Sequence, residues 1–324
     1  MFNLTSNISI GQFVDIKVND CKIVKSIYNY TETATIKIPI TSRVKRADET
    51  ITASADTAKL IAEGDRVQIL LGYDGRNKLE FDGFVSRVNF TTPCEIECEG
   101  FSYLLRKKTY KQSFKNTTLK KLLQHLVDGT SITLSSLIPE LKVDKWIMNQ
   151  QTGTEVLEEL KKELKVSIFF TGNELYAGLQ YLQPKADVKY RLGWNVIKDG
   201  NLKLREAKNR EVIVKIKGEK PDGTKVKVSV GEKGEIKEIR SHYVTDQATL
   251  TAIANAERNK LSYDGYEGKI TAFVEPYCEP GYGAIIIDRK YPERAGKYIV
   301  NAIEVQYGLS GARRIVDIGE KLRD

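Results

Sequence analysis

Apolar and polar residues alternate along most of the first hundred positions. The segments Phe13–Val18, Lys22–Tyr28 and Thr33–Pro39 each place apolar side chains at every second position, or nearly so. A period of two is typical of a strand that buries one side and exposes the other. The dipeptide Asp74-Gly75 favours a hairpin turn between two further strands. The remaining strands expected in this part of the chain are Val67–Leu71, Leu79–Phe90 and Cys94–Phe101.

Two segments interrupt this alternation. The segment Thr41–Ser54 follows no period and predicts a long loop. Residues 55–62, "ADTAKLIA", predict a short helix, for which Ser54 is a suitable N-cap because its hydroxyl can accept a hydrogen bond from a free backbone N–H group. Residues 1–100 are therefore expected to form a mainly β domain with one short helix.

The period lengthens to that of a helix in the middle of the chain. Residues 116–127, "NTTLKKLLQHLV", place four leucines on one helical face, with Asn116 or Thr117 as the expected cap. A second amphipathic helix follows Thr152, which forms a capping box with Glu155. A hairpin around Gly172-Asn173 is expected next. Residues 101–186 therefore predict an α+β domain.

Strand-like alternation returns from about residue 187. Residues 210–244 predict three strands joined by two hairpins, with turns at Pro221-Asp222-Gly223 and at Gly231–Gly234. A helix is expected at Gln247–Ser262, capped by Thr245 or Asp246. Four further strands are expected in the segments "GKITAFVEP", "GAIIID", "GKYIVNAIEVQY" and "RRIVDIG".

Two of these hairpins resemble each other. "EGDRVQILLGYDGRNKLEFDGFVSRVNF" and "PGYGAIIIDRKYPERAGKYIVNAIEVQYG" both begin with a turn glycine, run into an apolar strand, cross a charged loop and return in a second strand. From Gly64 to Val85 is 21 positions, and from Gly281 to Val300 is 19. Two generic hairpins can coincide in this way, and a duplicated domain is the alternative.

The order of elements favours duplication. Both ends of the chain show three strands, then a connection that contains a helix, then strands that include the similar hairpin. We therefore expect residues 1–100 and 187–324 to superpose as two antiparallel β-barrels, with corresponding strand order and a corresponding helix on each. The fold class predicted is mainly β, with two barrels flanking the small α+β domain at residues 101–186.

Composition and charge narrow the picture only a little. The chain has 324 residues, 41% of them hydrophobic, which is enough for two or three domains with ordinary cores. The 51 basic and 43 acidic residues give a formal net charge of +8, which permits an anionic partner without requiring one. Four cysteines without a CxxC pair are expected to be reduced thiols of a cytosolic protein. Neither a signal peptide nor a membrane-spanning segment is expected.

Chemistry-bearing motifs are scarce. The two histidines, His125 and His242, lie far apart and in no metal-binding motif, and Cys94 and Cys98 are expected to be small buried residues of one strand face. The chain contains neither a GxSxG elbow nor a GxxxxGK[ST] phosphate loop. We expect no catalytic residue, no metal site and no cofactor, so the protein is not expected to be an enzyme. A cell-wall glycan hydrolase is kept as an alternative, because carboxylate pairs depend on distances that the sequence does not give.

One charged stretch is a candidate interface. Residues 100–127 contain no acidic residue, and their basic side chains alternate with aromatic ones. Such a stretch is typical of solvated or protein-facing surfaces, and nucleic-acid binding is the alternative. The loop Thr41–Ser54 and the hairpin Lys217–Val230 are also expected to contact a neighbouring molecule, because both are rich in charged and poor in large apolar side chains. The candidate interface residues are Arg106, Lys107, Lys108, Lys111, Lys115, Arg43, Lys45, Arg46, Lys220, Asp222 and Lys225.

Several of these segments resemble a known family. "GDRVQILLGYDGRNKLEFDGFVSRV" and "CEGFSYLLRKKTYKQSFKNTTLKKLLQHLV" are similar to the first barrel and the following segment of baseplate hub proteins from contractile-tailed phages. "TGTEVLEELKKELKVSIFFTGNELYAGL" looks like the family's middle domain, and "GKYIVNAIEVQYGLSGARRIVDIG" resembles the closing strands of its second barrel. The family includes Mu-like phage hubs, late control protein D and the N-terminal part of type VI secretion spike proteins.

The resemblance implies a structural role and a set of partners. The resemblance implies a trimer in which each subunit supplies two barrels. Six similar barrels then form a ring between a six-fold tail tube and a three-fold central spike. The expected partners are two further copies of the chain, the spike protein, the tail tube protein, other baseplate proteins and, as a further candidate, the tape measure protein. DNA is expected only as transient cargo through the channel, and no membrane is expected as a partner. The expected location is the baseplate of a virion tail assembled in the bacterial cytoplasm.

The chain departs from the type VI pattern at its end. No needle or lysozyme segment follows the second expected barrel before Asp324, so the spike is expected to be a separate protein. The alternatives that stay open are the hub of a type VI or extracellular contractile injection system and, in a different class, a basic β-barrel protein that binds nucleic acid.

Overall fold

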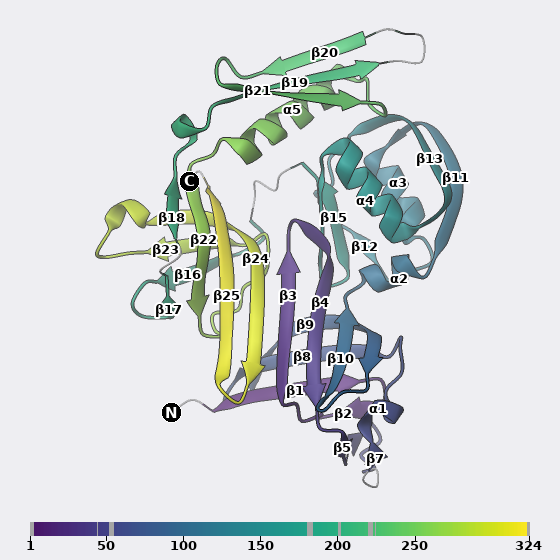
Figure 1. Cartoon of the computed structure of the whole chain (residues 1–324), viewed down its shortest axis with the longest axis vertical. Helices are drawn as coiled ribbons and strands as arrows, with labels where there is room; N and C mark the ends of the chain where they lie inside the picture. Colours follow the sequence, from purple (N-terminus) through teal and green to yellow (C-terminus); the bar gives the residue numbers. More distant parts are fainter. Residues whose placement is uncertain are drawn as a thin grey trace.

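The computed structural model describes residues 3–43, 45–51, 55–179, 184–199, 202–219, 223 and 225–322. The fold is mainly β, with short helical parts (Figure 1). Of the strands in the described residues, 15 belong to one sheet that runs through both ends of the chain. No helix in the described part of the chain has the length and apolar character needed to span a membrane.

The N-terminal region is built almost entirely of strands. The longer strands, among them β3, β4 and β8, bury alternate side chains, as their sequences predict. The elements are β1 (Leu4–Ile10), β2 (Phe13–Val14), β3 (Asp20–Ser26), β4 (Asn29–Ile38), β5 (Thr41–Ser42), β6 (Lys45–Arg46), β7 (Ala55–Asp56), α1 (Thr57–Leu60), β8 (Arg66–Tyr73), β9 (Arg76–Asn89) and β10 (Cys94–Glu99).

The middle region mixes helices with short sheets. The capping box predicted for the second helix is present, with the Thr152 side chain and the Glu155 carboxylate each accepting from the other's backbone N–H group. The hairpin predicted around Gly172-Asn173 joins β14 to β15. The elements are α2 (Ser102–Arg106), β11 (Thr109–Thr118), α3 (Leu119–Val127), β12 (Thr133–Leu134), β13 (Lys142–Thr152), α4 (Gly153–Leu164), β14 (Ser167–Thr171) and β15 (Glu174–Gly178).

The C-terminal region returns to strands around a separate small unit. The strands that join the large sheet are β16 (Asp187–Arg191), β17 (Val196–Lys198), β18 (Lys203–Arg205), β22 (Gly265–Ala272), β23 (Gly283–Ile287), β24 (Gly296–Gly308) and β25 (Gly311–Lys321). Between β18 and β22 the chain forms η1 (Ala207–Asn209), β19 (Val212–Glu219), β20 (Lys225–Val230), β21 (Glu235–Ser241) and α5 (Gln247–Leu261). The short helix η2 (Pro292–Arg294) lies between β23 and β24.

The two β regions share one strand order. The N-terminal region has the order β1-β8-β9-β10-β4-β3, and the C-terminal region has the order β16-β23-β24-β25-β22 followed by β17 and β18. We leave the two-residue strands β2, β5, β6 and β7 and the separate sheet of β19, β20 and β21 out of the count, and take β17 and β18 as one strand. In chain order, the first strand of each region then pairs with the fourth, and the third with the sixth. One pair differs, since β1 and β8 are antiparallel whereas β16 and β23 are parallel.

The two similar hairpins also agree in backbone detail. The Gly64 N–H donates to the Val85 carbonyl at 2.8 Å, and the Gly281 N–H donates to the Val300 carbonyl at the same distance. Both glycines have positive φ, which a side chain disfavours. One residue further on, Ser86 and Asn301 are each skipped in the pairing with the next strand, as in a β-bulge. These matched features fix which positions of the two regions are equivalent.

The helices do not follow this correspondence, so the expectation of a matching helix on each region is wrong. In the N-terminal region α1 precedes the fourth strand, whereas in the C-terminal region α5 precedes the third. Helix α5 covers the sheet of β19, β20 and β21, and these elements share a hydrophobic core with the middle region. The two β regions share the other large core. Their division into separate barrels at residues 100 and 187 stays a prediction.

The three strands of the small C-terminal unit are not two successive hairpins, as the sequence suggested. Strand β19 lies in the centre, antiparallel to β20 and parallel to β21. The connection from β20 to β21 crosses the start of β19, where ideal Cβ atoms on Gly231 and Gly234 would lie 2.5 and 1.9 Å from backbone oxygens of Val212 and Glu211. The two glycines thus allow a close crossing rather than a hairpin turn.

Some smaller expectations also need correction. The expected strand at Phe13–Val18 is reduced to β2, because the chain turns at Gly11 and Asp15, both with positive φ. Strand β1, which no expectation covered, takes its place in the sheet. The N-caps of two helices differ from those expected, since Asp56 caps α1 and Thr118 caps α3, and Ser54 lies outside the described residues. Asp246, one of the two caps expected for α5, is confirmed. Strands β11 and β13, which pair with each other, were likewise not expected.

Candidate functional site

The two β regions meet along a pair of strands from opposite ends of the chain. Strand β24 pairs with β3 over seven residues, from Ala302 opposite Ser26 to Gly308 opposite Asp20 (Figure 1). On the solvent-facing side, the Lys22 ammonium lies 3.1 Å from the Glu304 carboxylate. Because strand β3 is an edge of the N-terminal region, the pairing turns two sheets into one.

A buried ion pair lies beneath this junction. The Arg314 guanidinium on β25 contacts both carboxylate oxygens of Glu80 on β9, at 2.7 and 3.1 Å, and both side chains are 0% exposed. Arg314 also donates to the backbone oxygens of Val274 and Cys278. Burial raises the pKa of Glu80, and the Arg314 guanidinium opposes that effect. A bidentate pair without water requires both partners in place, so it fixes the two regions relative to each other.

A second buried cluster joins the same two regions. The Lys25 ammonium on β3 lies 2.8 Å from the Glu279 carboxylate, which follows β22, and both side chains are buried. The Tyr277 hydroxyl contacts Glu279 and also donates to the Leu79 carbonyl at 3.2 Å. Burial lowers the pKa of Lys25, but the Glu279 and Glu32 carboxylates raise it overall, so the ammonium stays charged.

Glu32 is the uncompensated member of this cluster. It lies on β4, it is 3% exposed, and its Oε1 atom has no hydrogen-bond partner in the described structure. Burial raises its pKa to about 7, with Glu279 and Asp82 acting in the same direction and Lys25 acting against them. The cluster therefore changes its charge near neutral pH.

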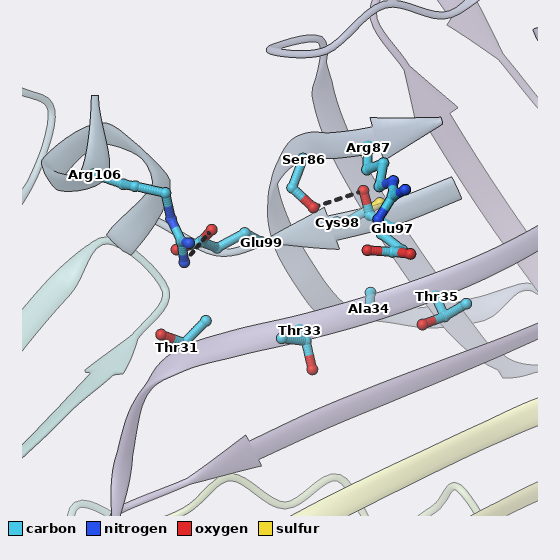
Figure 2. Close-up of a pocket in the computed structure, with 10 residues that line it drawn as sticks. All are labelled: Thr31, Thr33, Ala34, Thr35, Ser86, Arg87, Glu97, Cys98, Glu99 and Arg106. Atoms are coloured by element: carbon cyan, nitrogen blue, oxygen red, sulfur yellow. Dashed lines mark hydrogen bonds and ion pairs between the residues drawn. The ribbon is translucent and has the colours of Figure 1, made fainter. Parts of the chain in front are cut away.

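A polar groove lies on the solvent-facing side of the same sheet. Figure 2 shows it lined by threonines of β4, by Ser86 and Arg87 of β9, and by Glu97 of β10. The Ser86 hydroxyl donates to the Glu97 carbonyl at 3.0 Å, and Arg106 forms an ion pair of 2.8 Å with Glu99 at one end. These contacts stabilise the wall of the groove, and they contain no activated nucleophile.

The described residues offer no metal site, since nowhere among them do three His, Cys, Asp or Glu side chains gather. His125 is half-buried between the rings of Tyr110 and Phe114, and His242 is exposed. Cys94 and Cys98 are buried, and burial raises the pKa of both thiols. The arrangement is thus one of packed strands and buried ion pairs.

The candidate residues of the basic stretch take part in local contacts. Arg106 is paired with Glu99, and Lys107 lies 2.6 Å from Glu63 and over the Tyr103 ring. Lys108 donates to the Asp128 carbonyl at 2.6 Å. Lys111 and Lys115 are exposed on β11, and Lys115 lines a second groove together with residues of β13. The structure thus assigns three of the five to internal contacts.

The other candidates lie at opposite ends of the molecule. Arg43, Lys45 and Arg46 belong to the segment around β5 and β6, and Lys45 bonds Glu49 at 3.3 Å. Lys225 begins β20, opposite Glu219. Figure 1 shows these two segments at the two ends of the longest axis, so they do not form one site. Lys220 and Asp222 lie outside the described residues, as do parts of both loops. The role of all these residues at an interface stays a prediction.

The sequence reasoning missed the residues that join the two β regions. A signal exists for three of them, because each of these lies in phase with apolar residues of its strand. Lys25 is two positions from Ile23, Glu32 two from Ala34, and Arg314 two from both Ala312 and Val316. A charge at an inward-facing strand position indicates a buried partner, although it does not say which one.

Comparisons with known proteins place the fold. No protein-family model and no curated protein sequence matches the chain. The 43 kDa tail protein of prophage MuSo2 from Shewanella oneidensis is 14% identical, with a TM-score of 0.67 over 97% of this chain and 98% of that one. The tail protein from Neisseria meningitidis MC58 is 12% identical, with a TM-score of 0.69 over 98% of this chain and 97% of that one.

A third structure extends the similarity beyond phages. The Escherichia coli c3393 protein, a component of the type VI secretion system with structural similarity to the T4 tail proteins gp27 and gp5, is 8% identical, with a TM-score of 0.57. The match covers 99% of this chain and 77% of that one. The chain therefore has the fold of phage tail proteins, a fold that a type VI secretion component shares.

Proposed function

We propose that the chain is the structural hub of a phage tail baseplate and that it acts as a trimeric symmetry adapter. The observation that carries this proposal is the repeated strand order within one continuous sheet. Three chains supply six copies of that strand order, which match a six-fold tube, while the trimer itself matches a three-fold spike. The fold shared with phage tail proteins supports the same role.

The mechanism is geometric rather than chemical. The ring receives the spike on one side and the first ring of tube protein on the other, and it leaves a channel for DNA when the spike departs. The polar groove of Figure 2 lies on the side of the sheet away from the hydrophobic core, so this side is available to solvent or to a partner. No bond is made or broken in this role, and the protein acts at the virion baseplate, assembled in the bacterial cytoplasm.

Electron microscopy tests the proposal directly. The chain is co-expressed with the spike and tube proteins encoded beside it, and the complexes are imaged. The expected result is a three-fold ring with six-fold pseudo-symmetry that carries both partners. A chain that stays monomeric and binds neither partner would overturn it.

The hub of a type VI secretion apparatus is the second candidate. It is favoured by the similarity to the Escherichia coli c3393 protein over nearly the whole chain. The genes beside the one for this chain distinguish the two candidate functions. A phage requires genes for a tape measure protein and for capsid proteins, and a secretion apparatus requires neither.

A further inference from the structure

Strand β24 has three neighbours, and their arrangement defines a joint. Along one side lies β25. Along the other side β23 covers the first residues of β24, up to Ile299, and β3 covers the rest from Ala302 onwards. The two strands on this second side come from different β regions, and they meet at the bulge residue Asn301. The joint between the two regions is therefore the second half of one edge of β24.

The equivalent half-edge of β9 has no strand beside it in the described structure. Strand β8 covers β9 up to Phe84, as β23 covers β24. Beyond the bulge at Ser86, β9 pairs with β10 on one side only. The segment from Ser86 to Phe90 thus presents the same half-edge that β24 presents to β3.

The counterpart of β3 in the C-terminal region is equally open. Strand β3 pairs with β4 on one side and with β24 on the other. Its counterpart β18 pairs with β22 on one side, and no described strand lies on the other. The chain therefore has two open strand edges: that of β18, which corresponds to the edge of β3, and that of Ser86–Phe90, which corresponds to the edge of β24.

We propose that β18 of one chain pairs with Ser86–Phe90 of the next chain, which repeats between chains the β3–β24 joint found within the chain. The partner is a second copy of this chain, because only another copy supplies the complementary edge in the same geometry. An open strand edge also favours pairing over solvent exposure. The inference rests on the proposed trimer and locates its contact.

The register follows from the equivalent positions. Ile96 and Val316 are equivalent, because each lies two positions before the residue that faces Val85 or Val300. Ile36 of β4 faces Ile96, and Ile270 of β22 faces Val316, so Ile36 and Ile270 are equivalent as well. Nearer the start of these strands, Thr33 of β4 faces Val24, and Glu267 of β22 faces Lys203. The pairing of β22 with β25 is irregular between Gly265 and Gly268, and Thr33 is matched with Glu267 because both are exposed, whereas Tyr266 is buried. Lys203 therefore occupies the position of Val24.

On the other strand, Asn89 occupies the position of Glu304, counted from Val85 and Val300. Val24 faces Glu304 within the chain, so Lys203 is expected to face Asn89 of the next chain. The neighbouring pairs are then Leu204 with Val88, and Leu202 with Phe90.

The apolar residues at these two open edges are more exposed than their equivalents inside the joint of the chain, as expected of edges whose partner is another chain. Phe90 is 75% exposed, whereas its equivalent Val305, inside the joint of the chain, is 1% exposed. Leu204 is 59% exposed, whereas its equivalent Lys25 is 4% exposed. The proposed register places these two exposed apolar side chains opposite apolar partners, which removes apolar surface from water.

Charge on the other side of the strands is complementary as well. Within the chain, the joint carries the Lys22–Glu304 ion pair on its solvent-facing side. In the proposed joint, Lys203 arrives beside Asn89, whose amide donates to Glu97 at 2.7 Å and to Glu95 at 3.4 Å. A lysine therefore meets a carboxylate pair at the corresponding place.

Disulfide trapping tests the register. The double variant Val88→Cys/Leu204→Cys places two thiols on one side of directly opposite positions, within the range that a disulfide spans. The matched control Asn89→Cys/Leu204→Cys moves one thiol by a single residue, which points it to the other side of the strand. The four native cysteines are buried, so they contribute little background. After mild oxidation, denaturing gels should show covalent dimers and trimers for the first variant and not for the control.

The outcomes separate this inference from the proposed function. Native mass spectrometry of the wild-type chain, alone and with the spike protein, gives the oligomeric state independently of the thiols. Trimers whose two double variants cross-link equally, or not at all, would overturn the joint and leave the hub proposal in place. A chain that neither cross-links nor forms a trimer would overturn both. Circular dichroism of each variant shows whether it is folded, and Leu204→Glu, at an exposed position, should weaken the trimer without unfolding the chain.

Discussion

Individual charged residues inside the sheet determine how its two regions hold together. Glu80 and Arg314 have no contact with water, and each is more than two hundred positions from the other in sequence. Burial of such a pair contributes little net stability compared with apolar residues, but removal of one partner leaves a buried charge without compensation. The pair therefore selects one arrangement of the two regions more than it strengthens that arrangement.

The first prediction concerns this pair. Arg314→Met should reduce the free energy of unfolding by about 3–5 kcal/mol, because Glu80 then stays buried without a partner. The double variant Glu80→Gln/Arg314→Met should recover much of the loss, since it removes both charges. Urea denaturation of the wild type, both single variants and the double variant gives the coupling between the two residues. A double variant no more stable than Arg314→Met would contradict the argument.

The second prediction concerns Glu32 and pH. Its pKa is raised to about 7 in the folded chain from an ordinary value of 4.5, so the folded chain binds this proton more tightly than the unfolded chain. The contribution of Glu32 to stability is therefore most favourable below pH 4.5, falls as the pH rises to about 7, and is constant above that. The change is on the order of 3 kcal/mol.

Glu32→Gln isolates this effect, because glutamine stays neutral. The stability of the variant relative to the wild type should rise between pH 4.5 and 7, as measured by urea denaturation at each pH. The variant Glu232→Gln, at an exposed position, serves as the control. A stability difference between Glu32→Gln and the wild type that does not change with pH would show that Glu32 is not the titrating group.

Among the elements, hairpins were easier to predict than crossings. The two similar hairpins and the capping box of α4 depend on short-range patterns, and the structure has both. The glycines before β21 carry the same local signal as a turn, but the connection they form crosses β19. A glycine permits both geometries, and only the position of the neighbouring strand decides between them.

The third prediction tests the crossing. Gly234→Ala should destabilise the unit of β19, β20 and β21 strongly, because its Cβ would lie 1.9 Å from the Glu211 carbonyl oxygen. Gly223→Ala is the matched control, since Gly223 also has positive φ but an added Cβ there would meet no atom of the described residues within 4 Å. The control should cost only about 1 kcal/mol from backbone strain. Thermal unfolding followed by circular dichroism compares them, and equal losses would contradict the crossing.

At the scale of the whole molecule, the sequence predicted the repetition but not the way in which the copies are joined. Periodicity identifies strands and the sides they bury, so the mainly β class and the duplicated hairpin followed from it. It contains no information on which strands of distant segments are neighbours. Asp20 and Gly308 face each other in the sheet, and the core of α5 is shared with the middle region, and no local pattern indicates either.

The fourth prediction follows from the shared sheet. Because β3 and β24 are paired and the two β regions share one core, they should open together. Arg314→Met should therefore accelerate amide hydrogen exchange in β3 and β4 as well as in β24 and β25. Helices α3 and α4, which belong to the other core, should respond less. An acceleration restricted to β24 and β25, measured by mass spectrometry, would contradict a common opening.

The buried ion pair also bears on the order of events in time. In the equivalent strands, the position of Arg314 is occupied by Cys94, so the proposed joint between chains has no guanidinium at this buried position. A joint that contains buried charges is expected to form and break slowly, because each ion must give up its water before it gains its partner, and must lose its partner before water returns. The proposed joint between chains has apolar side chains on its inner side and Lys203 on its solvent-facing side, so it is expected to open and close more readily. Each newly made chain is therefore expected to form the joint between its own two β regions first and to pair with other chains afterwards. Incorrect pairing between chains would then stay reversible, while the slowly breaking joint within each chain persists.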